Sequence, residues 1–270
     1  MDIINELPQD QFNNIDDLLA FVSIYDDEER TNAYYSLLDD FGDKITEKYC
    51  VEAGCGFGLL AERMAQLGAK KVYAVEANPH LFDIAAHRLS RYSNIQVIHS
   101  DIRNFVPDEI IDVLVHDFFG QLVFDEDIYV LDQLLFSPKY ILPNRALLKM
   151  SLLSSEHYVD DVVSPNVVKK LDGALVSGLF EENDLALDRT ILQWQPGEQS
   201  RKTTINLSGQ TGDLLCFGLE IYQNDKFICR AGVCENWSLV WTPRSGDEFT
   251  LEFKPSARGT EVHIDWICNS

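Results

Sequence analysis

The chain has 270 residues, and its 44 acidic and 22 basic side chains give a formal net charge of −22. This length supplies enough material for one large domain or two modest ones. Because a surface this acidic repels phosphates, it argues against nucleic acid and anionic membranes as partners and favours a cationic substrate. A need for solubility would explain the same acidity equally well.

Six cysteines are scattered along the chain, and no C-x-x-C pair occurs among them. This spacing favours reduced thiols in a cytoplasmic protein over a disulfide framework. No apolar run is long enough to cross a membrane, and the acidic N-terminus does not resemble a signal peptide. We therefore expect a cytoplasmic enzyme without a membrane segment, and we expect no metal site.

Residues 1–46 are rich in acids and predict helices. A second helix is expected from about Asp27 to Leu38. In the first helix, four apolar residues recur at helical spacing and so share one face: Ile15, Leu18, Leu19 and Val22.

Three glycines follow the apolar run from Tyr49 to Val51, in the order Gly54-x-Gly56-x-Gly58, with Glu52 before them. A helical pattern over 58–67 leaves this stretch. A strand that enters a helix through three glycines needs a tight turn that a ligand can approach closely. The N–H groups at the helix start suit a polar or anionic ligand. An ordinary glycine turn in an α/β domain is the alternative.

The spacing of these glycines departs from the G-x-G-x-x-G of dinucleotide sites. Together with Glu52, it resembles motif I of the class I S-adenosylmethionine methyltransferases, E/D-x-G-x-G-x-G. The resemblance implies that Gly54, Gly56 and Gly58 lie beneath the methionine moiety of S-adenosylmethionine. It also implies that Glu52 holds the amino group of that cofactor.

Strands and helices alternate after the glycine stretch, which predicts a parallel, doubly wound, Rossmann-like sheet. Ligands of such sheets bind at the carboxyl ends of the strands. Glu76 ends the second strand and is placed to accept hydrogen bonds from ribose hydroxyls. Asp101, with the Ile102 backbone beside it, is placed to reach the adenine amino group, although it could equally be a turn aspartate. The expected elements are strand 72–76, helix 79–91, strand 95–98 and strand 111–116.

The segment after the fourth strand resembles the double-glutamate hairpin of the protein arginine N-methyltransferases. The family pattern is S-E-W/L-x-G, then five residues and a second E. Gly120 and Glu126 fall on the matching positions, and Asp117 stands where the first glutamate would be. The alternatives are a helix N-terminal acid for Glu126 and a turn residue for Asp117.

Three further stretches resemble the same family, in the family's order, over roughly residues 25–270. Residues 27–31 are similar to its D-E-x-R-T helix, which implies that Arg30 binds the cofactor carboxylate. Residues 140–146 are similar to its L-x-P-x-R-A junction. Asn236 and Trp237 occupy the place of its T-H-W loop, which implies that they contact the substrate.

The resemblance implies a guanidinium substrate held by two carboxylates. A guanidinium stays protonated at physiological pH, so its nitrogens are poor nucleophiles until they are oriented. Paired carboxylates at Asp117 and Glu126 would orient it, and Glu126 would take up the proton. His116 is an alternative base. The implied acceptor is arginine, in a peptide or protein or as the free amino acid.

Three features depart from the family. Asp117 is one methylene shorter than glutamate, Asn236 replaces the loop histidine, and the Y-F-x-x-Y motif has no clear counterpart. These departures keep two alternatives open. One is an N-methyltransferase that acts on a small molecule or another nitrogen nucleophile, and the other is a catalytically silent regulatory homologue.

Short runs of period two begin at Arg145 and predict an antiparallel β-barrel or sandwich. The resemblance implies a dimerisation arm in the region 164–188, which argues for a homodimer, although this region could pack on its own barrel instead. We expect N-terminal helices that cover the cofactor site over 1–46. We expect a Rossmann-like cofactor domain over 47–143 and a β-barrel for substrate binding and dimerisation over 144–270.

Overall fold

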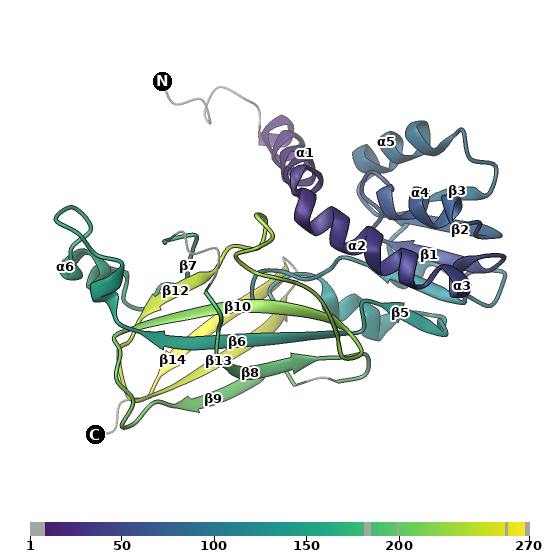
Figure 1. Ribbon diagram of the computed structural model, residues 1–270. Coiled ribbons are helices and arrows are strands. Elements are labelled where there is room, and N and C mark those ends of the chain that lie inside the picture. Colours follow the sequence, from purple (N-terminus) through teal and green to yellow (C-terminus); the bar gives the residue numbers. More distant parts are fainter. Residues whose placement is uncertain (1–8, 181–184, 199, 257–258, 268–270) are drawn as a thin grey trace. The chain divides into compact units, whose positions relative to one another are not determined.

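The computed structural model describes residues 9–180, 185–198, 200–256 and 259–267 (Figure 1). The chain forms two compact units. Unit 1 comprises residues 1–117 and 133–143, and unit 2 comprises residues 118–132 and 144–270. The sequence prediction placed 118–132 in the first domain, whereas this segment groups with unit 2. One reason is the packing of Phe124 against Phe253, with ring centroids 5.5 Å apart.

Unit 1 begins with α1 (Gln9–Asp26), α2 (Glu28–Asp40) and α3 (Gly42–Ile45). Asp27 separates the first two helices because its carboxylate accepts the Arg30 N–H at 3.0 Å, which caps α2. Tyr34, Leu37 and Leu38 are buried along α2. The apolar face predicted on α1 exists but lies outward, with exposed fractions from 37% to 59%: Ile15, Leu18, Leu19 and Val22.

A parallel five-stranded sheet forms the centre of unit 1, in the order β3-β2-β1-β4-β5. The strand order reverses beside β1, which is where ligands bind in open α/β sheets. The prediction of a Rossmann-like, doubly wound sheet is therefore confirmed. The sequence did not predict β5. The strands are β1 (Tyr49–Ala53), β2 (Lys71–Glu76), β3 (Ile95–His99), β4 (Val113–His116) and β5 (Tyr140–Leu142), and the helices between them are α4 (Leu59–Gln66) and α5 (Pro79–Leu89).

Unit 2 contains antiparallel sheets, as the period-two pattern predicted. Phe217 on β10 packs edge-on against Phe249 on β13, and this contact joins the two sheets. The larger sheet has the order β7-β12-β10-β6-β8 with β11 beside β10, and the smaller has the order β14-β13-β9. The strands are β6 (Arg145–Leu153), β7 (Val176–Ser177), β8 (Arg189–Trp194), β9 (Lys202–Asn206), β10 (Leu214–Gln223), β11 (Lys226–Arg230), β12 (Val240–Pro243), β13 (Glu248–Ser256) and β14 (Gly259–Trp266).

The region in which we expected a dimerisation arm contains α6 (Pro165–Val168), the short strand β7 and no helical hairpin among its described residues. Val168 is only 3% exposed. Phe180 packs edge-on against Trp241, with centroids 5.2 Å apart. Residues 181–184 lie outside the described part. Most described residues of this region are nevertheless exposed, Val167 by 47%. The homodimer therefore stays a prediction.

None of the helices in the described ranges combines the length and the apolar character that crossing a bilayer requires.

Candidate functional site

The loop between β1 and α4 requires its glycines. Gly54, Gly56 and Gly58 have φ angles of 67°, 51° and 77°, in the left-handed region that other residues rarely adopt. A Cβ on Gly58 would lie 2.5 Å from Cδ1 of Leu89 on α5. The sequence therefore folds here into a tight turn at the carboxyl edge of the sheet, directly before a helix N-terminus.

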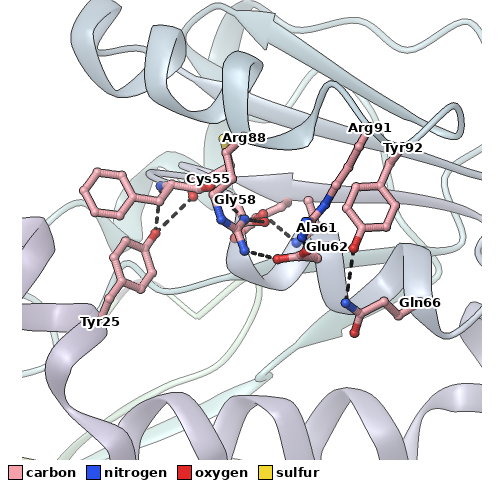
Figure 2. A network of polar contacts seen from close by, with 11 residues as sticks. Tyr25, Cys55, Gly58, Ala61, Glu62, Gln66, Arg88, Arg91 and Tyr92 are labelled. Carbon is pink, nitrogen blue, oxygen red and sulfur yellow. Dashed lines mark hydrogen bonds and ion pairs between the residues drawn. The ribbon is translucent and has the colours of Figure 1, made fainter.

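Tyr25 of α1 lies on this loop (Figure 2). Its hydroxyl donates to the Cys55 carbonyl at 3.2 Å and accepts the Phe57 N–H at 2.9 Å. Its ring stacks on Phe57 with centroids 4.8 Å apart. Burial raises the pKa of Tyr25 well above its ordinary value, so the hydroxyl stays protonated. A Cβ on Gly56 would meet both Tyr25 and Phe21.

Neither of these two aromatic residues was predicted to contact the glycine loop. Phe21 and Tyr25 are spaced by four on a helix, which places them on one face. That signal could have indicated an aromatic face on α1 directed at the domain.

Glu52 is almost fully buried, and its Oε2 accepts the Ala61 N–H at 2.7 Å. Its carboxyl group therefore lies beneath the first turn of α4. Burial raises its pKa to about 8, assisted by the nearby charge of Glu76 and opposed by the amide bonds from Ala61 and Leu60. At neutral pH the folded state keeps Glu52 largely protonated.

Glu52 should make stability depend on pH. Its pKa in the folded state lies above the value of 4.5 expected in the unfolded state, so the folded state binds the extra proton between these values. Stability from this group is therefore present at low pH and is lost as pH rises towards about 8. Between pH 5 and pH 8, the free energy of unfolding of the unmodified protein should fall by at least about 1 kcal/mol relative to that of Glu52→Gln, whose side chain stays neutral. Urea unfolding at both pH values measures this, and parallel profiles would contradict it.

Glu76 ends β2 and is 6% exposed. Its Oε2 accepts the Gly56 N–H and its Oε1 accepts the Asn78 N–H, both at 2.8 Å. Each carboxylate oxygen has a second lone pair and can accept a further hydroxyl. Glu76 thus joins the glycine loop to the end of the neighbouring strand.

Asp101 is engaged locally. Its Oδ1 accepts the Arg103 N–H at 2.8 Å and the Arg103 Nε–H at 2.9 Å. The Arg103 side chain holds the pKa of Asp101 below its ordinary value. These contacts are those of a turn aspartate, which was the alternative for this residue. Ile102 beside it is buried.

Asp117 and Arg30, which the sequence assigned to substrate and cofactor respectively, bind each other. The Arg30 Nε and Nη2 atoms both contact Oδ2 of Asp117, at 2.9 Å and 2.8 Å. Tyr34 donates to the other carboxylate oxygen at 2.8 Å. The Arg30 side chain is only 5% exposed, whereas that of Asp117 is 23% exposed. The structure thus places a guanidinium and a hydroxyl on the carboxylate that was expected to hold a substrate guanidinium.

His116 is completely buried, and its Nε2 lies 3.0 Å from the Pro143 carbonyl oxygen. Burial lowers its pKa to about 3, so the imidazole is neutral. A ring closed off from solvent in this way is poorly placed to accept a proton from a substrate, which argues against His116 as a base.

The remaining site candidates belong to unit 2. Glu126 is exposed. Asn236 is half-buried, whereas Trp237 is only 2% exposed, and the Trp237 indole N–H donates to the Phe119 carbonyl at 3.1 Å. Trp237 therefore holds the segment that follows β4. The substrate contact expected of Asn236 and Trp237 stays a prediction.

No group of three or more His, Cys, Asp or Glu side chains within the described residues has a geometry that could hold a metal ion.

Residues 50–131, which include the glycine loop, match the family model described as "Methyltransferase domain". The matched stretch contains Glu52, Glu76, Asp101 and Asp117, and Arg30 reaches it from α2.

The chain is also similar in sequence to curated arginine methyltransferases. It is 26% identical over 182 residues to "Protein arginine N-methyltransferase 2" of Dictyostelium discoideum, covering 64% of this chain and 35% of that protein. It is 31% identical over 137 residues to "Probable protein arginine N-methyltransferase 6" of Arabidopsis thaliana, covering 47% of this chain and 31% of that protein. The chain spans about a third of the length of these relatives.

Solved structures share the fold beyond the methyltransferase domain. A chain of the "Trypanosoma brucei PRMT1 enzyme-prozyme heterotetrameric complex with AdoHcy" matches with a TM-score of 0.72 and 14% identity, covering 92% of this chain and 93% of that chain. Arabidopsis thaliana protein arginine methyltransferase 10 matches with a TM-score of 0.65 and 16% identity, covering 90% of each chain. The resemblance to class I, arginine-methyltransferase-like proteins is therefore shown in sequence and in fold.

Proposed function

We propose that the chain is an S-adenosylmethionine-dependent N-methyltransferase whose acceptor is an arginine guanidinium, in a peptide or protein or as the free amino acid. The carboxylate of Asp117 carries this proposal. It follows β4, beside the methyltransferase glycine loop, and its two oxygens already hold a guanidinium and a hydroxyl. That arrangement supports a site with affinity for guanidinium groups.

The residues of unit 1 fit the proposed cofactor. Gly54 is exposed and left-handed, so a ligand can approach the backbone there. Glu76 has lone pairs left for ribose hydroxyls. The assignments of Glu52 to the amino group and of Asp101, with the Ile102 backbone, to the adenine stay predictions, because both carboxyl groups already have partners in the chain. S-adenosylmethionine supplies an electrophilic methyl group when bound.

Arg30 has two partners in the proposal. Its guanidinium pairs with Asp117 in the structure, and it would move to the carboxylate of the cofactor. This exchange frees Asp117 to hold the substrate guanidinium. The long arginine side chain permits such a shift, and its planar donor fork matches either carboxylate.

Asp117 and Glu126 would orient the substrate guanidinium by charge-assisted hydrogen bonds. Localising the positive charge on the bound nitrogens leaves the third nitrogen better able to attack. Glu126 would accept the proton released there. Because the attack is an in-line displacement, orientation supplies much of the acceleration.

A small-molecule N-methyltransferase is the second candidate. Asp117 is shorter than the family's glutamate, and Arg30 and Tyr34 already fill its contacts. Incubation with isotopically labelled S-adenosylmethionine tests both candidates: label in an arginine peptide or free arginine supports the proposal. Label only in other amines would favour the second candidate, and no transfer together with no binding would favour a silent homologue.

Assembly and compartment belong to the same proposal. Five of the six cysteines are free and buried, which is consistent with a reducing cytoplasm. A homodimer would cover the exposed apolar face of α1, where Leu19 is 59% exposed. Light scattering at micromolar concentration decides between one chain and two.

Glu76→Ala should weaken S-adenosylmethionine binding by roughly 1.5–3 kcal/mol, because hydrogen bonds to a carboxylate are charge-assisted. Calorimetric titration measures the change. Glu109→Ala is the matched control, since Glu109 bonds Tyr73 in the same unit and has no contact with the glycine loop among the interactions described. Equal affinities for all three folded proteins would refute the assignment of Glu76.

A further inference from the structure

Arg88, in the last turn of α5, contacts the glycine loop through two of its carbonyl groups. Its Nη1 donates to the Phe57 carbonyl at 3.2 Å and to the Gly58 carbonyl at 3.1 Å. Its Nη2 forms an ion pair with Oε2 of Glu62 on α4 (Figure 2). One guanidinium thus connects α5, α4 and two consecutive carbonyl groups of the loop.

Glu62 anchors this guanidinium. Its side chain is 9% exposed, while that of Arg88 is 30% exposed. Oε1 of Glu62 pairs with Arg91, whose side chain is 67% exposed, and accepts the Tyr92 hydroxyl at 2.7 Å. Both arginines therefore share one carboxylate. Of these two arginines, only Arg88 has a described hydrogen bond to the glycine loop.

Bonding the two carbonyls fixes the direction of the peptide groups that contain them. A trans peptide holds its N–H opposite its C=O, so the N–H groups of Gly58 and Leu59 are oriented away from the Arg88 side. The Gly58 N–H is used within the loop, where it donates to the Cys55 carbonyl at 2.6 Å. The Leu59 N–H stands at the N-terminus of α4, the end that favours polar and anionic ligand groups. The Glu62 N–H also bonds the Gly58 carbonyl, at 3.1 Å, so Arg88 adds to the restraints on a residue whose φ angle is itself little restricted.

We propose that Arg88 is a positioning residue for the cofactor: it holds the Phe57–Gly58–Leu59 backbone in the orientation that binds S-adenosylmethionine. The inference rests on the proposed function for the identity of the ligand. Leu89, the next residue, packs against Gly58 and supports the loop at the same place. Holding the loop in its binding conformation before the ligand arrives lowers the entropy cost of binding.

Three variants separate this role from a general contribution to stability. Arg88→Met removes the carbonyl bonds and one partner of Glu62, whereas Arg91→Met removes the other partner and leaves the loop contacts intact. Arg88→Lys keeps a positive charge for Glu62 but replaces the planar fork by a single ammonium group.

Calorimetric titration with S-adenosylmethionine gives the first readout. Arg88→Met should weaken binding about tenfold, the equivalent of one lost hydrogen bond to a charged group. Arg91→Met should change it less than about twofold, as expected for a solvent-exposed pair. Arg88→Lys should lie between the two. Equal weakening by the two methionine variants, or none from Arg88→Met, overturns the proposal.

Amide hydrogen exchange of residues 57–60 in the ligand-free protein gives the second readout. Exchange there should be faster in Arg88→Met than in Arg91→Met, and should be partly restored in Arg88→Lys. If the unmodified protein does not bind S-adenosylmethionine, the proposed function fails. The exchange rates of residues 57–60 still test whether Arg88 restrains the loop. If Arg88→Met does not fold, Arg88→Lys is compared with Arg91→Met in both measurements. Identical cofactor affinity and identical exchange rates in these two variants overturn the proposal.

Discussion

Glu126→Gln is expected to lower the rate of methyl transfer by roughly 10²–10⁴-fold, which is the range that a general acid–base group contributes. Glutamine is nearly isosteric but can neither pair ionically with a guanidinium nor accept its proton. Because Glu126 is exposed, the exchange should leave stability almost unchanged. A loss of activity then reports on chemistry rather than on folding. Cofactor affinity should also stay the same, since no proposed cofactor contact involves Glu126.

The neighbouring residue provides the control. Asp127 is also exposed, and Asp127→Asn removes one negative charge at nearly the same place. Initial rates with a labelled methyl donor compare the variants. If Glu126→Gln retains turnover close to that of Asp127→Asn, Glu126 has no part in the chemistry.

Asp117→Ala is expected to lower the free energy of unfolding of unit 1 by about 3 kcal/mol. Removing one member of a buried ion pair is costly because the other charge stays in a poorly solvated place. Here Arg30 is 5% exposed and would lose the carboxylate that holds its Nε and Nη2 atoms. Tyr34 would lose its acceptor as well.

An exposed ion pair in the same unit is the control. Asp39 bonds Arg63 through both carboxylate oxygens, at 2.8 Å and 2.6 Å, but the two side chains are 44% and 33% exposed. Asp39→Ala should cost less than about 1 kcal/mol, as surface pairs do. Urea unfolding of both variants measures the contrast. Similar losses of unfolding free energy in the two variants would mean that the burial of Arg30 does not increase the cost of removing its partner.

The sequence by itself predicted the features that depend on local pattern. The glycine spacing predicted a turn that only residues free to adopt positive φ can make, and Gly54, Gly56 and Gly58 do adopt it. The alternation of apolar runs with helical stretches predicted the parallel sheet of unit 1. Period two predicted the antiparallel strands of unit 2. These patterns are readable because each depends on residues only a few positions apart.

The tertiary structure decided which side chains bind one another. Arg30 and Asp117 are 87 residues apart, and their sequence motifs predicted a different ligand for each, although the fold pairs them. Trp237 lies 118 residues from the Phe119 carbonyl that binds its indole, so its burial could not be read locally. Tyr25 and Arg88 likewise form their hydrogen bonds to the glycine loop only after α1 and α5 pack against it. A residue type fixes which bonds a side chain can form, but its partner depends on packing between distant segments, and that information resides in the fold.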